Sequence, residues 1–328
     1  MPAPFRIFIP DTEASERMKL ATRLAALPNV AVRTGADFST SEERMLRDVE
    51  DADVLCVALA RVSASVIAAA PNLRMVVKCG IGTDNIDLEA ARSRGISVVR
   101  TAGVNFRGVA EYVIGAVIVH FRRVLELNSA IRTDDWTPLR QKWAGRVESL
   151  QGRVIGVVGA GAIGREVVRL ALAHGMRALV HDPHVPESAL RELGVEPVGL
   201  EQLLADSDVV TLHALLTPET THLISTDQLR AMQPHAILIN TSRGPVVDEK
   251  ALVLALDQGA IGGAVLDVFE TEPLPSNSPL RSLPNCILSP HLAGCTDGGY
   301  AEIGERAAEL VELFLNGRPL ISGCVVVP

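Results

Sequence analysis

Short apolar runs alternate with helical segments through the first hundred residues of the chain. The pattern predicts strands over residues 6–9, 30–33, 54–57, 75–78 and 96–99. Between them it predicts helices over residues 13–27, 41–49, 63–70 and 87–94. Strands that alternate with helices in this way are typical of a parallel, doubly wound sheet, in which each strand is covered on both faces.

A second series of the same kind begins near residue 153. Before it come a long apolar helical pattern over residues 108–127 and a polar stretch, 132–146, that contains Trp136 and Trp143. The second series predicts strands over residues 154–158, 178–181, 209–213, 236–239, 264–268 and 287–288. The last segment, 299–316, has the apolar spacing of an amphipathic helix.

The two series predict two domains, because 328 residues exceed what one ordinary core accommodates. The C-terminal helix follows the last strand of the second series and must pack somewhere. We expect it to return to the first domain, which then becomes discontinuous. The expected division is residues 1–102 plus 296–328 for one domain and 103–295 for the other.

Composition narrows the class of protein. Hydrophobic residues make up 48% and charged residues 21%, as in a globular protein. The net charge of −8 and the lack of a basic stripe argue against a nucleic-acid partner. The apolar runs are much shorter than a membrane span, and the N-terminus has no basic region followed by an apolar stretch. We therefore expect a cytoplasmic protein with no membrane partner.

The five cysteines are scattered along the sequence, with no C-x-x-C pair and no metal-ligand spacing. This distribution is typical of reduced thiols in a reducing compartment and predicts no metal site. Cys295 lies near the candidate active-site residue His291, where we expect an inert wall residue.

A glycine motif opens the second series. The predicted strand 154–158 leads directly into Gly159, Gly161 and Gly164, and a helical segment follows. Gly159 permits a tight turn, Gly161 lets backbone approach a pyrophosphate, and Gly164 allows close packing of helix on strand. The helix N-terminus supplies N–H groups and partial positive charge for phosphates. The motif predicts a dinucleotide site.

Asp182 stands at the end of the next predicted strand, at a spacing close to the roughly 20 residues typical of this motif. Its carboxylate can accept hydrogen bonds from the adenosine ribose hydroxyls and would repel a 2′-phosphate. The neighbouring His181 and His184 are the only nearby candidates to offset that charge, and no arginine is present between residues 181 and 185. We therefore predict NAD rather than NADP.

Three further segments, 240–245, 266–273 and 289–294, fall at or just beyond predicted strand ends, where open α/β sheets place their ligands. Together with the glycine motif they resemble the D-isomer-specific 2-hydroxyacid dehydrogenase family, which includes phosphoglycerate dehydrogenases and glyoxylate/hydroxypyruvate reductases. The resemblance implies a Rossmann NAD-binding domain, a flavodoxin-like substrate domain and a cleft between them.

The same resemblance implies a catalytic set of three residues. Arg243 matches the arginine that binds the 2-oxo acid, for which its planar fork is suited. His291 matches the acid–base histidine, which protonates the carbonyl oxygen as the hydride arrives and reverses this in oxidation. Glu272 matches the carboxylate that orients this histidine and favours its protonated form. Taken singly, each is more often an ordinary loop or salt-bridge residue, but their order beside a cofactor motif favours catalysis.

The family pattern also implies the binding contacts. Ile81 and Gly82 match backbone donors to the substrate carboxylate, and Asn105 matches a position near the hinge and the substrate. The residues that match the cofactor lining, besides the three glycines and Asp182, are Thr83, Ala162, Ile163, Ala214, Leu215, Thr220, Thr241, Ser242, Asp267 and Gly294. Among these, Asp267 matches a residue near the nicotinamide amide rather than a proton donor.

Departures from the family pattern bear on the substrate. Phosphoglycerate enzymes place an arginine and a serine after the third strand, where this chain has Val57 and Ala58, with Arg61 a few residues later. Phosphoglycerate is therefore disfavoured, although Arg61 keeps it open. Leu215 replaces a proline of many members, and Ala293 replaces a glycine.

Several alternatives share the scaffold. Formate dehydrogenases pair the histidine with glutamine, so Glu272 argues against that activity. A phosphite dehydrogenase retains a similar Arg–Glu–His set and stays open, as does a protein that senses NAD(H) as a corepressor. The helix from residue 108 and the arm with Trp136 and Trp143 resemble the family's dimer-forming region, so a homodimer is expected.

Overall fold

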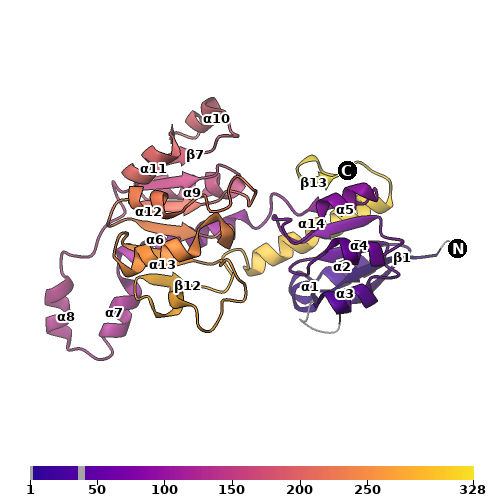
Figure 1. Ribbon diagram of the computed structural model, residues 1–328, viewed down its shortest axis with the longest axis horizontal. Coiled ribbons are helices and arrows are strands. Elements are labelled where there is room, and N and C mark those ends of the chain that lie inside the picture. Colours follow the sequence, from indigo (N-terminus) through magenta and orange to yellow (C-terminus); the bar gives the residue numbers. More distant parts are fainter. Residues whose placement is uncertain (1–2, 36–40) are drawn as a thin grey trace. The chain divides into compact units, whose positions relative to one another are not determined.

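The computed structural model describes residues 3–35 and 41–328. The chain divides into two compact units, and it crosses from one to the other twice (Figure 1). Unit 1 comprises Met1–Asn105 and Cys295–Pro328, and unit 2 comprises Phe106–Gly294.

Unit 1 is built on a six-stranded sheet with the order β13-β5-β4-β3-β1-β2. The five strands of the first series are parallel, in the doubly wound arrangement that the sequence predicts. Its strands are β1 (Phe5–Ile9), β2 (Val30–Thr34), β3 (Val54–Val57), β4 (Met75–Lys78), β5 (Ser97–Arg100) and β13 (Val325–Val327). The edge strand β13 was not predicted, and it runs antiparallel to β5.

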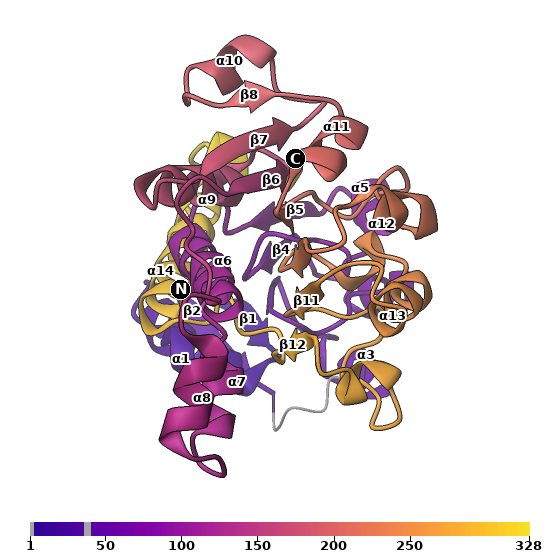
Figure 2. The ribbon, with the colours of Figure 1, turned by 90° about the vertical axis from the view of Figure 1, so that its left-hand side faces the viewer.

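Helices cover both faces of this sheet. Residues of α1 (Thr12–Met18), α2 (Leu20–Ala25) and α14 (Asp297–Leu315) share one apolar core with it. Residues of α3 (Glu42–Asp48), α4 (Ala64–Ala69) and α5 (Leu88–Ser93) form the other, and Figure 2 shows α1 and α14 opposite α3 and α5. A short 3-10 turn, η3 (Ser322–Cys324), precedes β13.

Two details of the helices depart from the sequence pattern. The expected helix over residues 13–27 is divided into α1 and α2 because Lys19 adopts a left-handed conformation, with φ 51°. The C-terminal helix approaches α1 so closely that a Cβ at Gly304 would lie 2.2 Å from the carbonyl oxygen of Met18. Only glycine fits there, and this close contact packs α14 against the end of α1.

Unit 2 is built on a seven-stranded, fully parallel sheet with the order β12-β11-β10-β9-β6-β7-β8. Its strands are β6 (Val154–Val158), β7 (Arg177–His181), β8 (Glu196–Pro197), β9 (Val209–Leu212), β10 (Ile237–Asn240), β11 (Gly263–Leu266) and β12 (Cys286–Leu288). The chain proceeds outward from β6 to β8 and then returns to place β9 on the other side of β6. The carboxyl ends of β6 and β9 therefore mark the switch point at which such sheets bind ligands.

The helices of unit 2 also form two layers. One apolar core includes residues of α6 (Phe106–Phe121), α9 (Ala162–Ala173) and α10 (Glu187–Arg191). The other includes residues of α11 (Leu200–Asp206), α12 (Thr226–Ala231) and α13 (Glu249–Asp257), and Figure 2 shows α6 and α9 opposite α12 and α13. Two 3-10 turns, η1 (Gly244–Val246) and η2 (Pro279–Ser282), lie in the loops after β10 and β11.

A helical arm follows α6. The helix predicted over residues 108–127 is interrupted by Arg123, with φ 51°, and continues as α7 (Val124–Ala130) and α8 (Trp136–Trp143). Both segments project away from the sheet of unit 2 (Figure 1). The arm exposes large apolar side chains at Val124, Leu125, Ile131 and Trp136.

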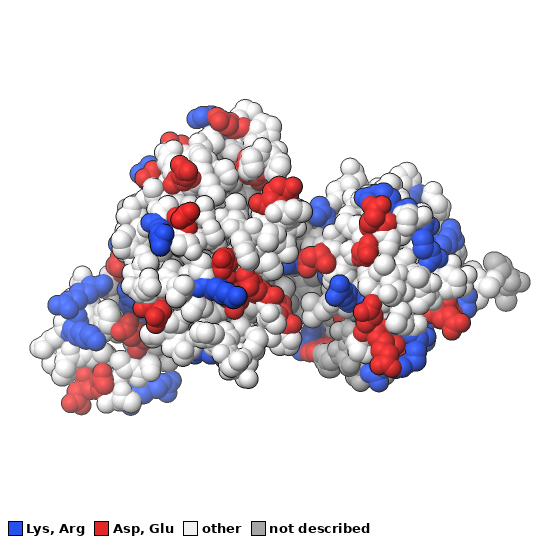
Figure 3. Space-filling model, viewed as in Figure 1, with Lys and Arg blue, Asp and Glu red and all other residues white. Residues whose placement is uncertain are grey.

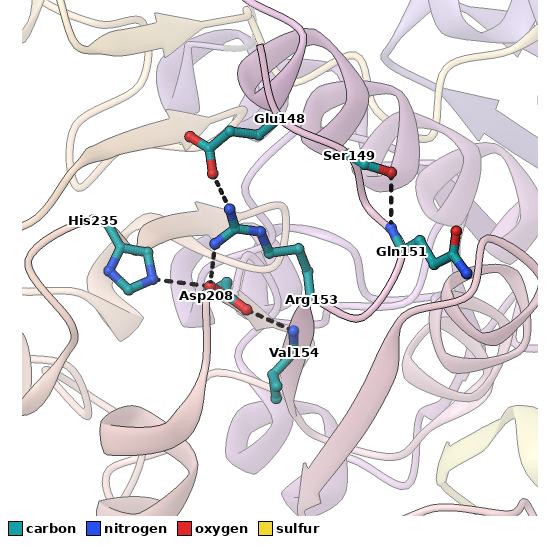
Figure 4. A network of polar contacts seen from close by, with 7 residues as sticks. All are labelled: Glu148, Ser149, Gln151, Arg153, Val154, Asp208 and His235. Carbon is teal, nitrogen blue, oxygen red and sulfur yellow. Dashed lines mark hydrogen bonds and ion pairs between the residues drawn. The ribbon is translucent and has the colours of Figure 1, made fainter. Parts of the chain in front are cut away.

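The amino ends of the unit 2 strands are joined by a polar network (Figure 4). Asp208, just before β9, accepts hydrogen bonds from the N–H of Val154 at 2.7 Å, from Arg153 at 2.8 Å and from His235 at 2.8 Å. Arg153 also pairs with Glu148. Burial alone would raise the pKa of Asp208, but these donors outweigh it and hold the pKa below its ordinary value. The network ties β6, β9 and the start of β10 together at the edge opposite the candidate site.

Charge and composition of the folded chain agree with a globular protein. On the face shown in Figure 3, acidic and basic residues are interspersed. Over residues 3–35 and 41–328, no helix is long and apolar enough to cross a membrane, and no group of His, Cys, Asp and Glu side chains could hold a metal ion. The five cysteines form no disulfide with one another.

Candidate active site

The glycine turn lies at the switch point between β6 and β9. A Cβ at Gly159, where φ is 97°, would lie 2.7 Å from the carbonyl carbon of His213, and one at Gly164 would lie 2.0 Å from the oxygen of Gly159. Gly161 is different, because a Cβ there would meet nothing within 4 Å. Two glycines therefore permit close packing within the protein, and Gly161 faces open space.

Helix α9 begins at this turn, with Ala162 and Ile163 in its first turn. Its N-cap, Gly161, has no side chain to accept a hydrogen bond from the first backbone N–H groups. These donors and the positive end of the helix dipole can bind a phosphate anion. The open side of Gly161 is where such an anion would approach.

Asp182, directly after β7, is held beside the glycine turn. Its Oδ2 accepts a hydrogen bond from the N–H of Ala160 at 2.7 Å, and its Oδ1 accepts one from the N–H of His184 at 2.9 Å. An ionised carboxylate has about four acceptor sites, so both oxygens retain capacity for ribose hydroxyls. The sequence motif and the geometry therefore agree on this position.

Two buried polar atoms at the same sheet edge have no hydrogen-bond partner among the described residues. They are Oγ1 of Thr241, directly after β10, and Nδ1 of His213, directly after β9. The Nε2 of His213 lies 3.0 Å from Oγ1 of Thr211, and burial lowers the pKa of this histidine to about 3. Unpartnered polar atoms are costly in a protein interior and commonly mark a site that a ligand completes.

The loop after His213 forms the adjoining wall. The hydroxyl of Thr220 donates to the carbonyl oxygen of Leu215 at 2.6 Å and accepts from the N–H of Thr217 at 2.8 Å. Ala214 is half-buried, and Leu215 is exposed. The glycine turn, Asp182 and the unpartnered atoms together fit a dinucleotide.

Glu272 and His291 face each other on neighbouring loops of unit 2. Oε2 of Glu272 lies 2.8 Å from Nδ1 of His291, and Oε1 accepts the N–H of Phe269 at 3.0 Å. Because an ionised carboxylate only accepts, Nδ1 carries the proton in this pair, and proton transfer to a substrate falls to Nε2. Burial would raise the pKa of Glu272, but the hydrogen bond and charge of His291, the N–H of Phe269 and the charge of Arg243 outweigh it and lower the pKa.

Arg243 occupies the turn between β10 and η1. Its Nη1 donates to the carbonyl oxygen of Ser242 at 2.8 Å, and its own carbonyl oxygen accepts from the side chain of Asn240 at 2.9 Å. The next residue, Gly244, packs directly on the backbone of Phe269, where a Cβ would lie 1.9 Å from the carbonyl carbon. The Arg243 turn and the Glu272 turn are therefore in contact, and the three catalytic candidates gather in unit 2.

Asp267 holds the loop that carries His291, a role that the sequence did not indicate. It is 1% exposed and accepts hydrogen bonds from the Ser289 hydroxyl at 2.6 Å and from the N–H groups of Leu292 and Ala293, both at 2.8 Å. The hydroxyl of Ser289 also lies 2.5 Å from that of Tyr112. Sequence reasoning missed both residues, because no motif connects them.

In unit 1, the expected substrate residues Ile81 and Gly82 and the expected cofactor residue Thr83 lie in the loop after β4 and are half-buried. Asn105 is the last residue of the first of the two chain segments that form unit 1, and its φ is 55°. Its N–H donates to Glu302 at 3.2 Å, and its buried Oδ1 has no partner among the described residues.

A buried carboxylate next to these residues was also missed. Asp11, which follows β1, accepts the N–H groups of Ala58 at 2.7 Å, Leu59 at 3.2 Å and Ala60 at 3.0 Å. The same loop is held by the side chain of Asn85, which donates to the carbonyl oxygen of Ala60 at 2.6 Å. The sequence signal is weak, an aspartate two residues after the end of a strand.

Lys78, at the end of β4, completes this arrangement. It is 6% exposed, donates to Asn85 Oδ1 at 2.9 Å and also bonds the carbonyl oxygen of Ala58. Unit 1 thus presents two adjoining loops, one after β3 and one after β4, that side chains fix in place.

Comparison with known proteins agrees with these features. Residues 114–293 match the family model described as D-isomer specific 2-hydroxyacid dehydrogenase, NAD binding domain. A glyoxylate reductase of Korarchaeum cryptofilum is 42% identical over 278 residues, which cover 84% of each chain. A D-3-phosphoglycerate dehydrogenase of Methanocaldococcus jannaschii is 36% identical over 95% of this chain and 58% of its own.

The solved structures extend the likeness to the whole fold. A D-lactate dehydrogenase from Aquifex aeolicus, complexed with NAD and lactic acid, has a TM-score of 0.86 and 26% identity, with 98% of this chain and 99% of that chain covered. The match covers nearly the whole chain, and so includes both sheets. The chain belongs to the D-isomer-specific 2-hydroxyacid dehydrogenase family and is an NAD-dependent oxidoreductase of 2-hydroxy acids.

Proposed function

We propose that the protein reduces a small, unphosphorylated 2-oxo acid, such as glyoxylate or hydroxypyruvate, with NADH. The observation that carries this proposal is the Glu272–His291 pair, which lies beside the Arg243 turn in unit 2. The relative named glyoxylate reductase supports the choice of substrate. Unit 1, discontinuous in sequence, is then the substrate domain.

The chemistry follows from the side chains. The bound cofactor supplies a hydride from nicotinamide C4 to the substrate C2. Arg243 binds the 2-oxo acid and polarises its carbonyl, since its donors are planar and always charged. Nε2 of His291 gives a proton to the carbonyl oxygen, and Glu272 holds the ring by Nδ1 and stabilises its cationic form.

The binding contacts extend the same proposal. The N–H groups of Ile81 and Gly82 receive the substrate carboxylate, and Asn105 lies close to it. Thr83 and Asp267 face the nicotinamide. With the cofactor bound, the N-terminus of α9 would hold the pyrophosphate, and Asp182 would receive the ribose hydroxyls. Support comes from the open side of Gly161 and from the unpartnered Oγ1 of Thr241.

The loop after β3 favours an unphosphorylated substrate. Val57 is fully buried in the sheet, and the N–H of Ala58 is bound to Asp11. Neither residue has a cationic or hydroxyl side chain that could bind a phosphate. Phosphoglycerate is the second candidate substrate. Arg61 is exposed a few residues later, and one relative is named D-3-phosphoglycerate dehydrogenase. Activity on 3-phosphoglycerate above that on glyoxylate would favour this second candidate.

The assembly and location are also proposals. The exposed apolar residues of α7 and α8 support a homodimer formed through the arm, because so much aliphatic and aromatic surface is seldom left in water. Light scattering of the purified protein would show a mass of two chains. Five cysteines without a disulfide support a cytoplasmic location.

The decisive experiment measures oxidation of NADH with a panel of 2-oxo acids for the wild type and for His291→Ala. We expect turnover on glyoxylate or hydroxypyruvate, and a loss of at least about 100-fold in kcat for the variant with NADH affinity nearly intact. Bound NADH without turnover on any 2-oxo acid would favour a sensor of NAD(H) instead. Equal loss of turnover and of NADH affinity would make His291 a structural residue.

A further inference from the structure

The segment that carries His291 is wrapped around the carboxylate of Asp267. The hydroxyl of Ser289 and the N–H of Leu292 reach Oδ1 at 2.6 and 2.8 Å, and the N–H of Ala293 reaches Oδ2 at 2.8 Å. The N–H of His291 itself donates to the backbone oxygen of Asp267 at 2.8 Å. One buried residue therefore receives donors from both sides of the catalytic histidine.

This arrangement is needed because His291 adopts a left-handed backbone conformation, with φ 56°. For a residue other than glycine this conformation costs on the order of 1 kcal/mol or more, and it persists only where surrounding contacts fix it. The direction of the imidazole toward Glu272 depends on that backbone. The hydrogen bonds to Asp267 therefore fix the backbone on which the ring direction depends, while Glu272 holds the ring itself.

The chain of hydrogen bonds continues to Tyr112 on α6. Its hydroxyl lies 2.5 Å from Oγ of Ser289. Ser289 has one proton, which it gives to the acceptor-only carboxylate of Asp267, so Tyr112 must donate to Ser289. Burial is the main cause that raises the pKa of Tyr112, and the tyrosine therefore keeps its proton at the pH of any ordinary assay.

We propose that Tyr112 and Ser289 are positioning residues for the acid–base step, which act on His291 through Asp267. This inference rests on the proposed function, because it assigns the two hydroxyls to the alignment of the proposed proton donor. Tyr112 lies on α6, which packs against α9, the helix that opens at the glycine turn. One helix thus contacts both α9 and the loop of the histidine.

A plain packing role predicts something different. The ring of Tyr112 contacts the apolar core of unit 2, so a tyrosine could be present only to fill space. Tyr112→Phe keeps the ring and removes the hydrogen bond, and Ser289→Ala breaks the chain at its middle atom. Ser289→Thr retains a hydroxyl and serves as the conservative variant. Ser282→Ala removes a serine hydroxyl that donates to Pro279 in the same unit, and is the matched control.

The experiment measures kcat, KM, NADH affinity and amide hydrogen exchange of residues 291–293 in each variant. We expect Tyr112→Phe and Ser289→Ala each to lower kcat by roughly tenfold, with KM and NADH affinity within about twofold, and to speed exchange of these amides. Ser289→Thr should restore most of the rate, and Ser282→Ala should match the wild type. The double variant should be no worse than the poorer single one, because both act through one chain.

Two outcomes would overturn the proposal. One is unchanged exchange and kcat in Tyr112→Phe together with a lower melting temperature, which would make the tyrosine a packing residue. The other is failure of Ser289→Thr to recover either readout. Exchange does not depend on turnover, so if the wild type reduced no 2-oxo acid, slow wild-type exchange that becomes fast in the variants would still support the positioning role while the proposed function failed.

Discussion

Each of the two units fixes a loop with a buried aspartate that stands within two residues of a strand end. In unit 1, Asp11 follows β1 and receives three consecutive N–H groups from the loop after β3, the strand next to β1. In unit 2, Asp267 follows β11 and receives donors from the loop after β12, the strand next to β11. The same device, an acceptor on one strand end and donors on the next, is used in both.

The difference lies in what each loop presents. The Asp11 loop exposes Leu59, which is 74% exposed, and is held further by Lys78 and Asn85. The Asp267 loop presents His291 in a left-handed conformation, and its hydrogen bonds continue through side-chain hydroxyls. An apolar loop needs only its backbone placed, whereas a proton-transfer group needs its ring direction fixed as well.

Replacement of Asp267 should have the largest effect. Asp267→Ala leaves three donors without an acceptor, at about 1–3 kcal/mol for each that water does not reach. We expect a loss of about 3 kcal/mol or more in the free energy of unfolding and a fall of at least about 100-fold in kcat. Urea unfolding and NADH oxidation measure the two, and NADH affinity is followed alongside. A stable variant with normal kcat would show that His291 needs no such support.

Replacement of Asp11 should have a similar effect on stability and a different one on catalysis. Asp11→Ala removes the acceptor for Ala58, Leu59 and Ala60, so unfolding in urea should again show a loss of about 2–3 kcal/mol. Because this loop is proposed to contact substrate rather than to move a proton, KM should rise several-fold while kcat stays within about threefold. If kcat fell as far as in the Asp267 variant, the two loops would have the same role.

The smallest effect is a pH dependence at the Glu272–His291 pair. The pKa of Glu272 is lowered in the folded chain, so its contribution to stability is present above the ordinary value of 4.5 and is lost as the pH falls below that value. The difference in unfolding free energy between wild type and Glu272→Gln should therefore shrink below about pH 4.5. With the side chain about a third exposed, it should not exceed about 1 kcal/mol. A difference that grew on acidification would contradict the assignment of the pair.

The sequence was sufficient where the chemistry is local. The glycine turn, Asp182, Arg243, Glu272 and His291 each lie in a short motif at or after a strand end, so the sequence alone was enough to single them out as candidates. Most parallel strands were predicted because buried apolar runs are continuous, but the two-residue edge strand β8 was missed because it has no such run. Breaks inside helices were not predicted, since Lys19 and Arg123 adopt left-handed conformations that neither residue type signals.

The supporting hydrogen bonds could not be predicted from sequence. Asp11 and Ala58 are 47 positions apart, and Tyr112 and Ser289 are 177 positions apart. Such pairs depend on which strands become neighbours, which apolar periodicity does not specify. The edge strand β13 was missed for the same reason, because three valines near a chain end favour a strand only when a partner is at hand.

The close approach of Gly244 to Phe269 has a consequence for redesign. The turn of Arg243, the proposed substrate anchor, and the turn of Glu272, the partner of His291, share one backbone boundary, with no space for a single methyl group. Any engineered shift of one turn displaces the other, so the proposed substrate anchor and the proposed proton donor cannot be moved independently. Efforts to retarget the enzyme to other 2-oxo acids should therefore leave these two turns intact and diversify the loop of Leu59.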